Sequence, residues 1–320
     1  MTKPIQTESE TRSARLATEV RRWLGLPNVL KLIASHPLNK DRKLRALARF
    51  VAWQAGSRLL QAPIVVPWVN GTRFIARRGD AGITGNLYCG LHEYSEMAFV
   101  LHAVMPEDLF VDIGSNVGSY VLLACGAAGA RGLAIEPIPT TYTKLVENLR
   151  LNDLLGRVRA INAGAADARG TLRFTSALDT TNHVAHDSLA TESIDVIEVP
   201  VYTIDELLDG ACASILKIDV EGYEYQVLKG AHNTLSRAKA IVIELNGSGT
   251  RYGHSDDQVV ASLHELGFSP YRYLPETRVL EPINDRERSW SSNAIFVRDV
   301  DGVRNALARP IRYELNGANL

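Results

Sequence analysis

From residue 109 onward, the apolar positions of the chain alternate between short continuous runs and longer stretches with a helical repeat. Continuous runs predict strands, and apolar residues every three or four positions predict helices. Strands are expected at residues 109–113, 132–135, 158–162, 214–218, 240–245, 268–273 and 294–297. Helices are expected at residues 119–128, 140–151, 222–228 and 256–266. This alternation predicts an α/β fold with a Rossmann-like, doubly wound, mostly parallel sheet, in which the last strand is a candidate antiparallel edge strand.

A basic helical segment precedes this α/β region. Residues 13–60 have a helical pattern, and the first 12 residues are expected to be disordered. Two interpretations are open: a solvated helix packed on the main domain, or a basic amphipathic helix that contacts an anionic membrane or a protein partner. The helical face that we expect to be apolar carries Leu44, Leu47, Phe50, Val51 and Gln54, and the other face carries Arg42, Arg45 and Arg49.

Short β-type runs separate the basic segment from the main α/β region. They predict a small hairpin at 64–66 and 72–76, and a second hairpin or edge pair at 171–174 and 198–201. A loop is expected at 85–90 and a helix at 93–105. The predicted division is a basic helical N-terminal extension (1–60), a small β/helical cover segment (61–105), the main domain (106–300) and a C-terminal tail (301–320).

Charge and cysteine usage narrow the class of protein. The chain has 35 Lys and Arg against 36 Asp and Glu, so the whole-protein charge gives no reason to expect nucleic-acid binding. The three cysteines, Cys89, Cys125 and Cys212, form no C-x-x-C pair, which fits a reducing compartment. The polar N-terminus does not resemble a secretory signal, and no apolar run reaches the length of about 18 residues that a membrane span needs. We therefore expect a cytoplasmic protein without a transmembrane segment.

The clearest chemical motif is the turn Asp112-Ile113-Gly114-Ser115-Asn116-Val117-Gly118, directly after the first main strand. Ligands of doubly wound sheets bind outside the carboxyl ends of the strands. Gly114 permits a tight backbone turn, and Gly118 permits a close approach of helix and strand. The backbone N–H groups of the following helix can hold an anion. The turn therefore predicts a ligand site at this edge of the sheet.

The residues of the turn favour S-adenosylmethionine over a dinucleotide. A dinucleotide requires G-x-G-x-x-G against its pyrophosphate, and Asn116 occupies the position of the second glycine. S-adenosylmethionine carries a carboxylate and cationic groups but no phosphate. Asp112 can attract its cationic end, and Ser115 and Asn116 can bind its amino-acid portion.

A second acidic position supports this interpretation. Glu136 ends the second main strand, where a carboxylate can accept both ribose hydroxyls, and Pro137 stops the strand there. After the third strand, Asp167 is a candidate acceptor for the exocyclic amine of adenine, although a solvated turn carboxylate is an equal alternative.

Four stretches resemble the FkbM family of methyltransferases: FVDIGSNVGSY (110–120), AIEPIPTTYTKLVENLRLN (134–152), LKIDVEGYEYQVLKGA (216–231) and IVIEL (241–245). The resemblance covers roughly residues 85–300, in the order of the family. It implies a class I methyltransferase fold and transfer of a methyl group to a hydroxyl, usually on a sugar, a polyketide or another secondary metabolite. The family usually has Ala at the position of Ser115, and the first 60 residues lie outside the resemblance.

Methyl transfer to a hydroxyl needs a base or a metal to remove the proton. The candidates are Asp219 and Glu244, which end the fourth and fifth strands, and Glu221 and the loop residue His183. Asp219 and Glu221 can instead stabilise the start of the next helix, and His183 can be an ordinary loop histidine. Asp219, Glu244 and Asn246 also form an oxygen-ligand set, so magnesium is conceivable, but no metal is favoured.

The leading hypothesis is therefore an O-methyltransferase that acts on a small molecule or a glycan. The alternatives are an N- or C-methyltransferase, an RNA or protein methyltransferase on the same fold, and a donor-binding scaffold without catalysis. The first 60 residues carry 12 basic and 4 acidic side chains, so the remainder is net acidic. An acidic main domain argues against a nucleic-acid substrate.

Overall fold

The computed structural model describes residues 27–60, 62–176, 182–185, 195–284, 290, 292–315 and 318–320. Its centre is an eight-stranded sheet with the order β12-β11-β13-β10-β9-β3-β4-β5. The five strands from β10 to β5 are parallel, and β13 lies antiparallel between β10 and β11. The strands are β3 (Leu109–Ile113), β4 (Arg131–Ile135), β5 (Val158–Ile161), β9 (Ile215–Ile218), β10 (Ala240–Leu245), β11 (Ser269–Leu274), β12 (Val279–Pro282) and β13 (Ser292–Val297).

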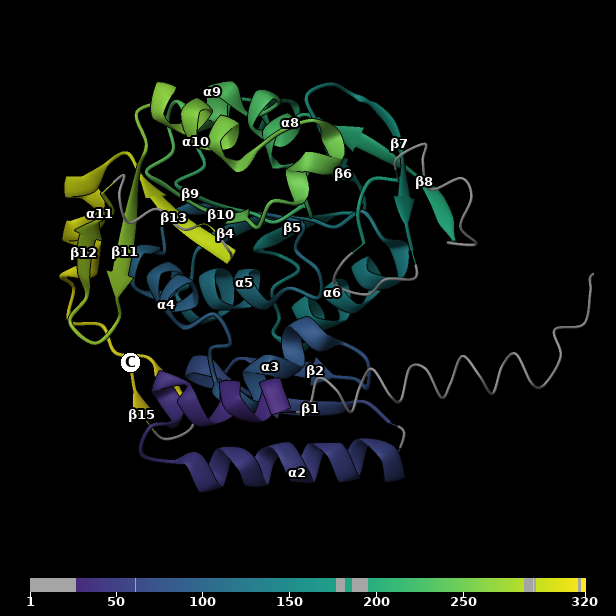
Figure 1. Cartoon of the computed structure of the whole chain (residues 1–320), viewed down its shortest axis with the longest axis vertical. Helices are drawn as coiled ribbons and strands as arrows, with labels where there is room; N and C mark the ends of the chain where they lie inside the picture. Colours follow the sequence, from purple (N-terminus) through teal and green to yellow (C-terminus); the bar gives the residue numbers. More distant parts are fainter. Residues whose placement is uncertain are drawn as a thin grey trace, which may run out of the picture.

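Helices cover both faces of this sheet, as Figure 1 shows. Because side chains alternate along a strand, Phe110 packs into the core on one face and its neighbour Val111 into the core on the other. One face is covered by α4 (Tyr94–Ala103), α5 (Ser119–Val121), the π-helical turn η3 (Leu122–Ala127) and α6 (Pro139–Leu151). The other is covered by α7 (Ile204–Leu208), α8 (Glu224–Lys229), α9 (His232–Leu235) and α10 (Asp256–Glu265).

The predicted strands and helices of the main domain are confirmed, with ends displaced by at most two residues. The expected antiparallel edge is confirmed, since β13, β11 and β12 all pair antiparallel at one side of the sheet. The strand β13 itself lies inside the sheet, because the hairpin of β11 and β12 continues beyond it. The second predicted hairpin is also confirmed: β7 (Gly170–Thr175) pairs antiparallel with β8 (Val196–Tyr202), and β6 (Gly164–Ala165) completes a separate small sheet.

The cover segment contains the predicted hairpin, β1 (Ile64–Pro67) with β2 (Arg73–Ala76), and the turn η2 (Val69–Gly71) between them. The loop expected at 85–90 is wrong, because α3 (Ala81–Cys89) covers it up to Cys89. Tertiary contacts outweigh the weak helical propensity of Gly85 and Asn86. A Cβ on Gly85 would lie 2.5 Å from the His92 ring, and the Asn86 side chain accepts a hydrogen bond from the backbone of His92.

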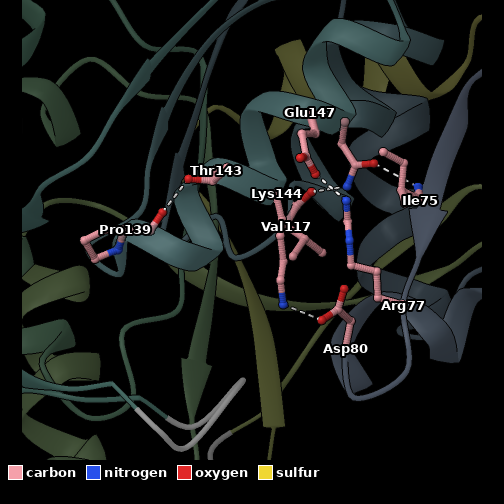
Figure 2. A network of polar contacts seen from close by, with 9 residues as sticks. Ile75, Arg77, Asp80, Val117, Pro139, Thr143, Lys144 and Glu147 are labelled. Carbon is pink, nitrogen blue, oxygen red and sulfur yellow. Dashed lines mark hydrogen bonds and ion pairs between the residues drawn. The ribbon is translucent and has the colours of Figure 1, made fainter. Parts of the chain in front are cut away.

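Polar contacts attach the cover segment to α6, as Figure 2 shows. Arg77 forms an ion pair with Glu147, and Lys144 Nζ lies 2.6 Å from Asp80 Oδ1. The buried Asn148 accepts a hydrogen bond from the backbone N–H of Ile75 and donates one to the carbonyl of Val117, each at 2.8 Å. These contacts fix α3 beside the turn that follows β3.

The described part of the N-terminal extension is helical at residues 27–35, at η1 (Pro37–Asn39) and at α2 (Lys43–Leu59). The face of α2 that packs against α3 carries Phe50 and Trp53, and the Phe50 ring meets the Tyr88 ring at 5.1 Å. The predicted apolar face is therefore partly wrong, because Leu44 and Val51 are 83% and 62% exposed. The segment expected to be disordered lies outside the described residues.

The chain ends with α11 (Val300–Leu307), which packs against α4, and with the short pair β14 (Glu314–Leu315) and β15 (Ala318–Asn319). A short turn, η6 (Ser248–Tyr252), follows β10. Among the helices that the structure describes, none is both long and apolar enough to cross a membrane.

Candidate active site

A cavity of about 1020 Å³ opens at the carboxyl ends of the parallel strands. It is bounded by the turn after β3, the end of β4, the segment after β9 and the end of β10. Nine of the predicted site residues line it: Asp112, Gly114, Ser115, Asn116, Glu136, Pro137, Asp219, Glu221 and Glu244.

The turn after β3 depends on glycine where the chain crosses β9. Gly114 has a φ of +77°, and a Cβ at this position would lie 1.8 Å from the backbone oxygen of Asp219. Gly118 has a φ of +96° and lies behind the turn, where a Cβ would meet Leu145 of α6. Gly114 therefore brings two strand ends together, while Gly118 sets the packing of the following helix and is not among the residues that line the cavity.

The side chains of Ser115 and Asn116 hold the turn itself. Ser115 Oγ donates to the carbonyl of Asp112 at 2.7 Å and accepts from the backbone N–H of Ile135 at 3.0 Å. Asn116 Oδ1 accepts from the backbone N–H of Val117 at 2.7 Å. The Ser115 contacts join the ends of β3 and β4, and the Asn116 contact holds the turn locally. The sequence did not predict these structural roles.

Glu136 is buried with its carboxylate directed at the turn. One oxygen accepts from the backbone N–H of Asn116 and the other from that of Ile138, both at 2.9 Å. Burial raises the pKa of Glu136 to about 7, and the two N–H donors oppose this shift. Each carboxylate oxygen can accept a further hydrogen bond, so Glu136 can bind a vicinal diol at the cavity wall.

Asp112 is 2% exposed, and its Oδ2 atom has no hydrogen-bond partner among the described residues. Burial raises the pKa of Asp112 to about 7, and the ammonium group of Lys217 opposes this shift. A buried carboxylate oxygen without a partner is costly unless a ligand satisfies it. The cavity beside Asp112 therefore suits a cationic or hydrogen-bond-donating ligand group.

Lys217 supplies the positive charge at the centre of the site. Its Nζ lies 2.8 Å from Asp219 Oδ2 and 5.1 Å from the ring centre of Tyr120. Strand pairing places Lys217 beside Asp112 in the sheet. The nearby carboxylates raise the pKa of Lys217 although burial opposes this. The lysine therefore remains charged within an acidic pocket.

Asp219, Glu221 and Glu244 form an acidic cluster, with one carboxylate oxygen of each within 4.8 Å of the others. Burial and the neighbouring Asp219 raise the pKa of Glu221 to about 7 and that of Glu244 to about 9. The three are close enough to share a cation. Asn246, expected in this set, is exposed, and its side chain accepts from the backbone N–H of Ser248.

Glu221 does not lie in the first turn of the following helix, because α8 begins at Glu224. Glu221 has a φ of +54°, which turns the chain there. Glu224 takes the helix-start role instead, since its Oε1 accepts from the backbone N–H groups of Val220 and Gly222, each at 3.1 Å. The Glu221 carboxylate is thereby left to face the cavity.

Besides Gly118, two predicted residues are not among those that line the cavity. Asp167 is half-exposed and pairs with Lys229 at 3.3 Å. His183 is held through its backbone against Thr175, and the cavity is lined instead by its neighbours Asn182 and Val184. Neither is placed to contact a ligand in this cavity.

For other cavity-lining residues, the neighbouring sequence gives little or no indication of a role in the site. Glu93 accepts from the Tyr120 hydroxyl and from the Asn293 amide, both at 2.6 Å. Glu93 begins the predicted helix at 93–105, directly precedes α4, and lies in the cavity wall. The contact with Asn293 spans 200 residues of sequence and has no local signal.

The cavity also extends to the N-terminal helices. Its far wall comprises Val29, Leu32, Phe50, Val51, Gln54, Ala55 and Arg58, together with residues of α3. The N-terminal extension, which lies outside the stretches that resemble a known family, is thus part of the pocket wall. This end of the cavity is largely apolar, in contrast to the acidic end at the strands.

Comparisons with known proteins agree with this geometry. Residues 112–270 match the methyltransferase FkbM domain. The hexuronic acid methyltransferase AglP of Haloferax volcanii is 27% identical over 157 residues, which cover 48% of this chain and 62% of AglP. This chain therefore spans less than two thirds of that relative. The methyltransferase sdnD of Sordaria araneosa is 31% identical, and the match covers 52% of this chain and 76% of sdnD.

Among solved structures, the putative transferase PH0793 of Pyrococcus horikoshii is 14% identical, with a TM-score of 0.40 over 80% of this chain and 83% of that one. This similarity is too distant to carry weight, so the fold assignment rests on the strand order, with an antiparallel β13 inserted beside five parallel strands. The strand order, the family match and the relationship to sdnD lead to one assignment. The chain belongs to the FkbM family of S-adenosylmethionine-dependent methyltransferases.

Proposed function

We propose that this methyltransferase transfers a methyl group to a hydroxyl of a small-molecule or glycan acceptor. The observation that carries the proposal is the acidic cluster of Asp219, Glu221 and Glu244, which faces the cavity beside the turn after β3. A hydroxyl must lose its proton as it is methylated, and a carboxylate with a raised pKa, as Glu221 has, is suited to accept it near neutral pH.

The residues at the carboxyl ends of β3 and β4 fit S-adenosylmethionine. Asp112 offers a buried oxygen without a partner to a cationic group, and Glu136 offers two oxygens to the ribose diol. A side chain at Gly114 would intrude on the backbone of Asp219 and distort this turn. Pro137 lines the adjoining wall. When bound, S-adenosylmethionine supplies an electrophilic methyl group.

Glu221 is the proposed general base. A carboxylate whose pKa is about 7 is largely ionised just above neutral pH and still takes a proton readily. Its carboxylate accepts the hydroxyl proton of the acceptor as the new oxygen–carbon bond forms and the methyl–sulfur bond of the donor breaks. Glu244, with a pKa of about 9, stays protonated at neutral pH and can orient the acceptor by donating a hydrogen bond.

Lys217 and Asp219 position this machinery. The ion pair at 2.8 Å holds the Asp219 carboxylate against Lys217 at the end of β9, and the charge of Asp219 helps to raise the pKa values of Glu221 and Glu244. Because Lys217 already balances part of the negative charge, we propose that the reaction needs no divalent cation.

A small-molecule or glycan acceptor is supported by the cavity and by one relative. A volume of about 1020 Å³ lies at the upper end of the usual range for ligand pockets, about 300–1,000 Å³, which leaves room for an acceptor beside the donor. The name of AglP describes a hexuronic acid methyltransferase. A sugar hydroxyl is therefore the first acceptor class to test.

The direct test is incubation with S-adenosylmethionine carrying a labelled methyl group and a panel of sugars, glycans and hydroxylated metabolites. The expected product carries the label on oxygen, as located by NMR. Label on nitrogen or carbon would overturn the proposed O-methylation. Tight donor binding with no turnover on the whole panel would instead favour a non-catalytic scaffold.

A further inference from the structure

The outward face of α2 carries a stripe of exposed apolar residues. Leu44, Ala48, Val51, Ala55 and Leu59 recur every three or four positions and are all exposed. Leu44 and Leu59 are each 83% exposed. The buried residues of the same helix, Ala46, Phe50, Trp53 and Ser57, lie on the opposite side, so α2 is apolar on both faces.

Basic side chains flank this stripe. Residues 27–60 contain seven Lys or Arg and a single acidic residue, Asp41. Lys43 and Arg45 are exposed and lie on either side of Leu44 around the helix, and Arg58 is exposed near the other end. An exposed apolar stripe between cations is the pattern of a helix that lies in the headgroup region of an anionic membrane, where apolar side chains enter the acyl boundary and long cations reach the phosphates.

The position of α2 in the fold suits this orientation. In Figure 1, α2 forms the outermost layer on the side of the molecule opposite α8, α9 and α10. Its stripe residues Val51 and Ala55, and the flanking Arg58, also line the cavity. The helix at 27–35 adds Val29 and Leu32 to the same wall. One end of the cavity therefore reaches the surface that carries the apolar stripe.

We propose that α2 docks the protein on an anionic lipid membrane and that the acceptor is an amphiphile drawn from that surface, with its apolar part against the α2 end of the cavity and its hydroxyl at the acidic end. The docking itself is independent of the chemistry. The identity of the acceptor class rests on the methyl transfer proposed above. Charge complementarity selects an anionic membrane over a neutral one.

The test is flotation of the full-length protein with vesicles of phosphatidylglycerol and phosphatidylcholine in equal amounts, and with vesicles of phosphatidylcholine alone. Binding to the anionic vesicles is expected to exceed binding to the neutral ones at least tenfold and to weaken as salt is raised. The double variant Leu44→Asp/Leu59→Asp is expected to lose at least tenfold in vesicle affinity, since it places carboxylates in the stripe. The double variant Lys43→Glu/Arg45→Glu is expected to lose a similar factor in vesicle affinity, because each cation near an anionic surface contributes about 1 kcal/mol to binding.

The matched control is Val279→Asp, which changes a half-exposed apolar residue of the edge strand β12 and is expected to bind vesicles like the wild type. Leu44 and Leu59 do not line the cavity, so their variants should keep wild-type affinity for S-adenosylmethionine by calorimetry. That measurement separates failure of docking from failure of the donor site.

Two results would overturn the docking. One is that the wild-type protein does not float with anionic vesicles, as would happen if another part of the chain covered the stripe. The other is a dimer in light scattering that the Leu44→Asp/Leu59→Asp variant converts to a monomer, because the stripe would then be a self-association surface. The protein could bind vesicles as expected and yet methylate two acceptors with the same sugar equally well, one carrying a short alkyl chain and one fully water-soluble. In that case the proposed amphiphilic acceptor is wrong.

Discussion

The ammonium group of Lys217 lies 2.8 Å from the carboxylate of Asp219, and the lysine side chain is only 2% exposed. The same cation opposes the rise that burial causes in the pKa of Asp112 on the neighbouring strand. A single buried charge thus balances carboxylates at the donor end and at the acceptor end of the cavity.

Removal of this cation should destabilise the fold. Lys217→Met leaves Asp219 and Asp112 without their nearest positive charge, and breaking a buried ion pair by removing one partner costs about 3–5 kcal/mol. Because Asp219 is about one third exposed, we expect the free energy of unfolding, measured by urea denaturation, to fall by about 3 kcal/mol. The double variant Lys217→Met/Asp219→Asn should recover part of this loss. Strictly additive effects of the two changes would show that the pair is not coupled.

Gly114→Ala should damage both stability and donor binding. The added Cβ would lie 1.8 Å from the backbone oxygen of Asp219, and the left-handed backbone at this position costs about 1–2 kcal/mol for a residue other than glycine. We expect a lower Tm and at least a tenfold weaker affinity for S-adenosylmethionine. Gly156→Ala is the control, since it adds a Cβ in open space. Wild-type behaviour of Gly114→Ala would mean that the turn does not depend on its contact with Asp219.

The pH dependence of turnover tests the base. A carboxylate that must be ionised and has a pKa of about 7 is protonated below that pH, so kcat/KM for the acceptor at saturating S-adenosylmethionine should rise tenfold per pH unit below about 7 and level off above it. Glu221→Gln should remove this rise and lower kcat at least about 100-fold. Glu244→Gln should keep it, because Glu244 is already protonated in this range. A rise that survives in Glu221→Gln would assign the base to another group.

Divalent metal should be dispensable. Since Lys217 already pairs with Asp219, prolonged treatment with EDTA is expected to leave turnover unchanged, and added Mg²⁺ should not increase it. Loss of turnover in EDTA that Mg²⁺ restores would instead mean that Asp219, Glu221 and Glu244 share a cation during the reaction.

The central sheet could be predicted because buried parallel strands read as continuous apolar runs. The residues that end them, Asp112, Glu136 and Asp219, could be placed together by the rule that parallel strands present their carboxyl ends at one edge. Asp167 was placed by the same rule and His183 was proposed as a loop histidine able to act as a base, but both lie on less regular segments. There, the ion pair of Asp167 with Lys229 and the strand-edge contacts of the His183 backbone direct them elsewhere.

The N-terminal part could not be predicted to the same extent. Both faces of α2 carry apolar residues, so periodicity could not distinguish the buried Phe50 from the exposed Leu44. In α3, Gly85 leaves room for the His92 ring, a packing contact that local propensity does not contain. The approach of Glu93 to Asn293 likewise depends on the finished fold.

The most direct test of the donor site is a calorimetric titration of S-adenosylmethionine into the wild type, Glu136→Ala and Glu136→Gln. The exposed Glu265 of α10 provides the control variant Glu265→Ala. Loss of hydrogen bonds to a charged carboxylate should weaken binding about 10- to 100-fold in both Glu136 variants. The control should match the wild type, and thermal unfolding should show that all four proteins are folded. Unchanged affinity in a folded Glu136→Ala protein would contradict the placement of the donor at the ends of β3 and β4.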